Sequence, residues 1–240
     1  MESLFSLDNN HLDEDDNIVF GSNESKEASE VFFGIDVSYS KKLMKKFDGI
    51  VKKKYLDSTL KHFQYFKSKL NSKGVNKDIE HCSIRRANGE IIEFYHGKRR
   101  EVRIHPDIEE EGRQTYIDTV IHSHPEGTVP ISSAADISKY AECGVINGIS
   151  HNELGTMIIT NNDYEGNKSK YEEIEEKIAP IREQMIDDFT VHANNGVPID
   201  WDNKEDVRRL NEYVDKNSRK YVLQYKKVLK QYNMDVKFNR

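Results

Sequence analysis

The feature that most constrains the fold is a pair of histidines at the end of an apolar segment, just before a predicted helix. Residues 116–122 have the pattern of a β-strand, and Pro125 ends it. Side chains two residues apart in a strand point to the same face, so His122 and His124 lie on one face. Residues 134–143 then predict a short helix. This order places both imidazoles at the end of a strand, across a loop from the first turn of a helix.

A carboxylate in that first turn is the best third ligand for a metal ion. Asp136 follows Ser133 by three residues, which is the spacing of a helix capping box. Acidic residues also favour helix N-termini without any metal. The two explanations are compatible, because a cap made by Ser133 would hold Asp136 in place. We therefore expect His122, His124 and Asp136 to converge on one ion.

The donor set indicates zinc in an open site. Hydrolytic zinc enzymes use three protein ligands and one water, whereas structural zinc is closed by four protein ligands that are usually rich in cysteine. The chain has only two cysteines, Cys82 and Cys143, so a closed thiolate site is excluded. Each cysteine is better explained as a small buried apolar residue than as a nucleophile. The sequence predicts one Zn²⁺ ion per chain.

Composition and charge argue against several classes of protein. The formal net charge of -6 disfavours a general nucleic-acid binder, since phosphate binding depends on clustered Lys and Arg. No apolar run approaches the roughly 20 residues that span a bilayer, and the N-terminus lacks the pattern of a signal peptide. We therefore expect a cytoplasmic protein that binds neither nucleic acid nor a membrane.

Composition and hydrophobic pattern divide the chain into three parts. Residues 1–28 are acidic and poor in large apolar side chains, and they predict a disordered leader. Residues 29–165 contain the histidine pair and predict the domain that holds the candidate zinc site. Residues 166–240 predict a helical extension. Its last helix is expected to cover the domain or to close a homodimer, and Trp201 is expected to anchor it.

Within the central part, the pattern predicts both helices and strands. Residues 38–70 favour either one kinked helix or two in tandem, the second capped by Asp57, Ser58 and Thr59. Residues 80–96 predict a hairpin around Asn88 and Gly89. The other expected elements are strands over residues 30–37, 101–105 and 155–160, and an acidic loop over residues 107–112.

The motif resembles the signature of a known family. His122-Ser123-His124-Pro125, Gly127 and Ser133-x-x-Asp136 are similar to the JAMM/MPN metalloproteases, also called the JAB domain, most strongly over residues 116–160. The resemblance implies an α+β fold with three α/β/α layers, a mixed central sheet and an MPN/cytidine-deaminase-like core, here with flanking helices. It also implies zinc-dependent cleavage of a peptide or isopeptide bond in a protein or peptide substrate, such as a ubiquitin-like conjugate.

The family also has a glutamate upstream of the histidine pair, which acts as the general base. Glu80 begins a predicted strand that follows a helix, as in the family, and Glu80-His81-Cys82 resembles the Glu-x-Cys of its phage and bacterial peptidases. Glu93, in the return strand, is the alternative, and Glu90 lies in the turn. The resemblance implies that Glu80 moves the proton and that Ser133 helps to stabilise the oxyanion.

Two other functions are compatible with the same resemblance. One is a non-catalytic MPN scaffold whose flanking helices recruit partners, and the other is a RadC-like protein associated with DNA processing. Scaffold members of the family commonly lose a histidine or the aspartate. The complete set of His122, His124 and Asp136 therefore favours the hydrolase.

Overall fold

The computed structural model describes residues 41–96, 104–125, 127–201 and 203–240. The leader expected over residues 1–28, the strand expected over residues 30–37 and most of the strand expected over residues 101–105 lie outside this part. The strands are β1 (His81–Arg86), β2 (Ile91–His96), β3 (Ile117–Ser123), β4 (Val145–Asn152), β5 (Gly155–Asn161) and β6 (Met234–Asn239). The helices are α2 (Lys41–Phe47), α3 (Lys53–Leu70), α4 (Pro106–Gln114), α5 (Ala134–Glu142), α6 (Tyr164–Asn167), η1 (Lys168–Lys170), α7 (Tyr171–Ala193), α8 (Lys204–Leu229) and η2 (Lys230–Tyr232).

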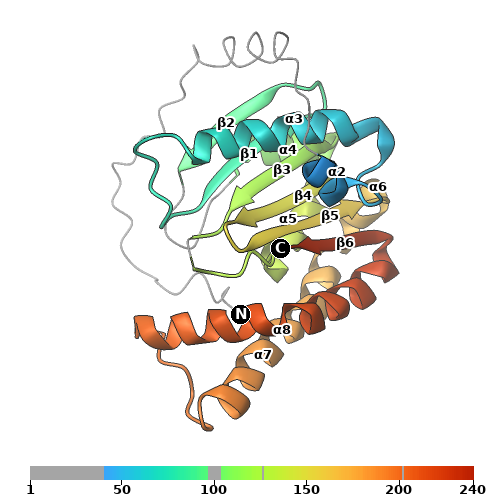
Figure 1. The fold of residues 1–240 in the computed structure, drawn as a ribbon. Helices are drawn as coiled ribbons and strands as arrows, with labels where there is room; N and C mark the ends of the chain where they lie inside the picture. The colour runs from blue at the N-terminus through green and yellow to red at the C-terminus, as the bar shows by residue number, and fades with distance from the viewer. Residues whose placement is uncertain (1–40, 97–103, 126, 202) are drawn as a thin grey trace.

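The six strands form one mixed sheet in the order β2-β1-β3-β4-β5-β6. Strands β3 and β4 are parallel, and α5 makes the crossover between them. All other neighbours are antiparallel. The expected mixed α+β architecture is confirmed at this level, with helices on both faces of the sheet (Figure 1).

Two hydrophobic layers sandwich the sheet. Helices α2 and α3 cover one face, where their side chains pack against the sheet residues Ile121, Ile149 and Ile158. The other face packs against α5, α7 and α8 through Val120, Met157 and other sheet residues. All seven residues of β3 are buried, the polar ones included, so the strand shows no alternation of buried and exposed side chains.

The N-terminal helical region contains two helices in tandem, which resolves the alternative left by the sequence. The break between α2 and α3 includes Gly49, whose φ of 77° is the left-handed conformation that glycine adopts readily. Helix α3 begins at Lys53. The expected cap at Asp57, Ser58 and Thr59 is therefore wrong, and these residues lie inside the helix. Thr59 is buried there and accepts a hydrogen bond from Arg85.

The acidic segment over residues 107–112 is helical, so the predicted loop is wrong. Pro106 occupies the first turn of α4, and the side chain of His105 caps it by accepting from the Asp107 backbone N–H at 3.3 Å. Acidic residues in the first turn favour this helix electrostatically. Gly112 fits a close approach, because a Cβ there would lie 2.6 Å from the Cys143 carbonyl oxygen.

Two strands were missing from the sequence prediction. Strand β4 is buried throughout, but it contains Asn147, Gly148, Ser150 and His151. These polar or small residues interrupt the apolar pattern from which a buried strand is predicted. Strand β6 pairs with β5, so residues 166–240 are not purely helical and end in the sheet of the predicted hydrolase domain. None of the helices in the described residues is both long and apolar enough to cross a membrane.

Candidate metal centre

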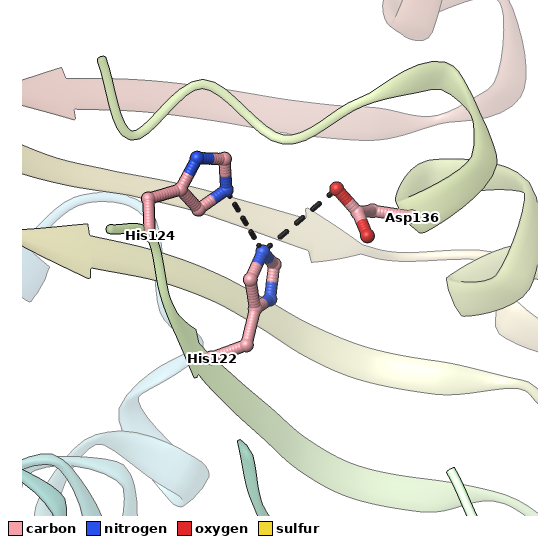
Figure 2. A group of neighbouring side chains, drawn as sticks. All are labelled: His122, His124 and Asp136. Carbon is pink, nitrogen blue, oxygen red and sulfur yellow. Dashed lines mark hydrogen bonds and ion pairs between the residues drawn. The ribbon is translucent and has the colours of Figure 1, made fainter. Parts of the chain in front are cut away.

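The two histidines and the aspartate meet where β3 ends and α5 begins. His122 is in β3 and His124 follows the strand, and their Nε2 atoms lie 3.1 Å apart. The Asp136 Oδ2 lies 3.8 Å from the Nε2 of His122. Figure 2 shows the three side chains pointing toward one another. One donor atom from each of the three residues lies within 4.8 Å of the others. In the part of the chain that the structure describes, no other group of three His, Cys, Asp or Glu residues comes this close. This cluster can hold a metal ion.

A capping box fixes the position of the carboxylate. The Ser133 hydroxyl accepts from the Asp136 backbone N–H at 3.1 Å, and the Ser133 backbone N–H donates to the Asp136 Oδ2 at 2.7 Å. The predicted cap is therefore confirmed. It also directs the carboxylate toward the histidines, so the cap and the ligand position arise from the same two hydrogen bonds.

A buried tyrosine contacts the far side of His122. The Tyr140 hydroxyl lies 3.0 Å from the His122 Nδ1, and both side chains are almost fully buried. Tyr140 is four residues after Asp136 in α5, so the two side chains lie on the same helix face. A hydrogen bond to Nδ1 leaves Nε2 free to bind a metal and fixes the ring orientation.

The backbone of β4 makes room for that tyrosine. A Cβ on Gly148 would lie 2.2 Å from the ring of Tyr140, so a larger residue at this position would displace the ring. Sequence reasoning missed Tyr140. The signal was available in the spacing from Asp136, but only the structure shows that the hydroxyl faces His122.

Burial keeps both imidazoles in the neutral form that binds metal. It lowers the pKa of His122, although Asp136 opposes the shift. Burial and the neighbouring His122 lower the pKa of His124 to about 3. Burial works against ionised Asp136, but the two histidines and the hydrogen bonds from Ser133 hold the pKa of its carboxyl below the usual value. Near pH 7 the cluster therefore offers two neutral nitrogen donors and one carboxylate.

The strand register brings Glu80 beside the histidines. Cys82 pairs with His122 across β1 and β3, so Glu80, two residues earlier, falls opposite His124 on the same face. The His81 backbone N–H supports this alignment by donating to the Ser123 hydroxyl at 3.0 Å. Glu80 is 9% exposed. It lines a cavity together with His124 and Ser133.

The other two glutamates lie elsewhere. Glu90 is exposed in the hairpin turn, where its carboxylate lies 3.0 Å from the Arg86 guanidinium. Glu93 is in β2, which β1 separates from β3, and its side chain lies outside the described part of the structure. Among the three candidates, the geometry brings Glu80 to the histidines.

The cavity next to the cluster has a volume of about 140 Å³. Besides Asp78, Glu80, His124 and Ser133, its wall includes residues of the loop after His124, of α7, of α8 and of the segment between these two helices. Sequence reasoning did not predict that the C-terminal helices line the cavity beside His124. Trp201, expected to anchor the last helix, is half-buried and lines this cavity.

No match to this chain was found among protein-family models, curated proteins or solved structures. The assignment of the site therefore depends on its own geometry. The two thiols offer no competing chemistry, because both are buried and burial raises the pKa of Cys82 and brings that of Cys143 to about 12. A thiol with a raised pKa is a poor nucleophile at neutral pH.

Proposed function

We propose that this chain is a zinc-dependent hydrolase that cleaves a peptide or isopeptide bond in a protein or peptide substrate, such as a ubiquitin-like conjugate. One observation carries the proposal. His122, His124 and Asp136 converge on one point, and His124 lines the adjacent cavity together with Glu80. The similarity of the same residues to the JAMM/MPN signature supports this reaction class.

The donor set suits zinc. Two imidazole nitrogens and one carboxylate oxygen are typical ligands of catalytic zinc, and a fourth position remains for water or substrate. The histidines are neutral, and Asp136 is held by the Ser133 cap, so little reorganisation is needed for binding. The Tyr140 hydroxyl supplies the outer contact that a metal-binding imidazole normally makes.

The metal ion, Glu80 and Ser133 would have different roles in the proposed reaction. Zinc, when bound, supplies a Lewis acid that polarises the carbonyl and makes water more acidic. The Glu80 carboxylate takes the proton of the attacking water and returns it to the leaving amine. The Ser133 oxygen accepts from the Asp136 N–H, and in the proposed reaction the Ser133 O–H donates to the developing oxyanion. One such donor contributes about 3 to 4 kcal/mol in other hydrolases.

The test separates metal binding from hydrolysis. Purified protein should contain one zinc ion per chain by elemental analysis, and His124→Ala should lose it. Glu80→Gln should keep the zinc but lose cleavage of an internally quenched peptide library. Glu90→Gln, the matched control in the exposed turn, should change neither.

Each contrary result has a distinct meaning. Full activity in Glu80→Gln would remove Glu80 from the proton-transfer role and direct attention to Glu93. Zinc far below one ion per chain in metal-replete medium would contradict the hydrolase and favour a scaffold.

A further inference from the structure

We propose that the cavity beside the metal cluster is a specificity pocket for one large apolar side chain, of leucine or phenylalanine size, on the substrate residue next to the cleaved bond. This inference rests on the proposed hydrolase function and adds the class of substrate. It assigns α7 and α8 the role of choosing the substrate.

The position of the cavity links it to the reaction. His124, Glu80 and Ser133 lie in its wall, so a side chain inside it belongs to a residue whose backbone is at the metal cluster. The loop after His124 supplies further wall residues, including Val129 and Ile131, and both are buried. The cavity and the catalytic groups therefore form one continuous site.

The part of the wall that α7 and α8 contribute is mostly apolar. Helix α8 presents Val207, Leu210 and Val214 at the spacing of one helix face. Helix α7 adds Met185 and Ile186, and Trp201, in the segment between the helices, also lines the cavity. The polar residues in the lining outside the reaction site are Asp78, Thr128, Arg182, Asn211 and Tyr225. Most of the remaining surface suits a hydrocarbon side chain.

The volume sets the size of that side chain. The cavity measures about 140 Å³. An engineered protein cavity of about 150 Å³ with fully apolar walls binds benzene. One leucyl or phenylalanyl side chain therefore fills the pocket, whereas glycine leaves it empty. Burial of such a side chain should strengthen binding about ten- to hundredfold relative to glycine.

The chain carries its own reporter for this binding. Trp201 is the single tryptophan, is half-buried and lines the cavity, so an apolar group that enters should change its fluorescence emission. We suggest titrating the full-length protein, in a chelator to prevent cleavage, with acetyl-Ala-Leu-Ala-amide and acetyl-Ala-Gly-Ala-amide. The leucine peptide should bind at least tenfold more tightly. Equal affinities of the two peptides would overturn the pocket, whether or not the protein hydrolyses anything.

A pair of substitutions on α8 adds a structural test. Val207 is half-buried and lines the cavity, so Val207→Phe should fill the pocket and reduce the preference for leucine at least fivefold. Leu223→Phe is the matched control, because Leu223 is 56% exposed and absent from the cavity wall. An unchanged preference in folded Val207→Phe would overturn the pocket. If that variant fails to fold, the comparison of the two peptides on the unaltered protein decides alone.

The same series separates this inference from the proposed function. Zinc content and cleavage of the peptide library report on the hydrolase. The fluorescence titration reports on the pocket alone. If the protein prefers the leucine peptide but cleaves nothing, the pocket is supported and the hydrolase function is contradicted. If it cleaves peptides but binds both test peptides equally, the hydrolase function is supported and the pocket is contradicted.

Discussion

Replacement of Tyr140 by phenylalanine should weaken metal binding while leaving all three ligands in place. The Tyr140 hydroxyl lies 3.0 Å from the Nδ1 of His122, and both side chains are buried. When the Nε2 of His122 binds a metal, its Nδ1 carries a hydrogen and donates to the tyrosine oxygen. Tyr140→Phe would leave that N–H buried without this acceptor.

The magnitude follows from the cost of that unpaired donor. A buried N–H without a partner costs about 1 to 3 kcal/mol. Loss of an outer-shell partner typically reduces metal affinity 10- to 100-fold, which corresponds to about 1.4 to 2.8 kcal/mol. The two estimates agree. The cost is greatest in the metal-bound form, because in the free form the hydrogen can move to Nε2 and be shared with His124, 3.1 Å away.

Zinc affinity, measured by competition with a chelating dye, provides the assay. Tyr221→Phe is the matched control, because Tyr221 is also buried. Its hydroxyl donates to Asp188 at 2.9 Å, so the substitution also removes one hydrogen bond. Both variants should lose similar stability without metal, as measured by urea unfolding. Only Tyr140→Phe should bind zinc more weakly. Equal zinc affinity for Tyr140→Phe and the unaltered protein would refute the positioning role.

Two further predictions concern stability. Burial lowers the pKa of His151 to about 4, below its unfolded value of about 6.5, so the unfolded state takes up the proton first and stability falls as the pH drops below about 6.5. The unfolding free energy should fall between pH 7 and pH 5, and His151→Gln should reduce this fall by about 2 kcal/mol, measured by urea unfolding in the presence of a chelator. An unchanged pH dependence of the unfolding free energy would contradict this. Arg85 and Asp118 form a buried ion pair at 2.6 Å, so Asp118→Asn should cost about 3 to 5 kcal/mol by leaving a buried cation. Glu205→Gln, in an exposed pair with Arg208, should change thermal unfolding little, and equal losses in the two variants would refute the argument.

The positions of the three candidate ligands were predictable because they depend on local rules. Alternation along a strand places His122 and His124 on one face, and a capping box places Asp136 at the helix start. Both rules act over a few residues and need no knowledge of the rest of the chain. Glu80 required more, since its place opposite His124 depends on the register between β1 and β3. The resemblance to a family suggested it, and the register supports it.

The parts that sequence reasoning missed depend on distant or buried contacts. Strand β4 carries polar residues that are paired internally, such as Asn147, whose side-chain oxygen accepts from the Thr160 hydroxyl at 3.1 Å. Such a strand lacks the apolar pattern that reveals a buried strand. Strand β6 is short, and it is defined by pairing with β5, more than 70 residues earlier. Neither periodicity nor capping reports pairing over that distance.

That distant pairing also determines what kind of pocket α8 can form. At the C-terminal end of α8, η2 and β6 connect the helix to the sheet. The Asn167 side chain donates to the Tyr232 carbonyl of η2 at 2.7 Å. Near its start, the Arg209 guanidinium donates to the Asn194 side chain at 2.8 Å and so joins α8 to the end of α7. A helix held at both ends is a fixed wall. The cavity is therefore formed before substrate arrives, and its preference for a side chain follows from shape and apolar burial without closure of a lid.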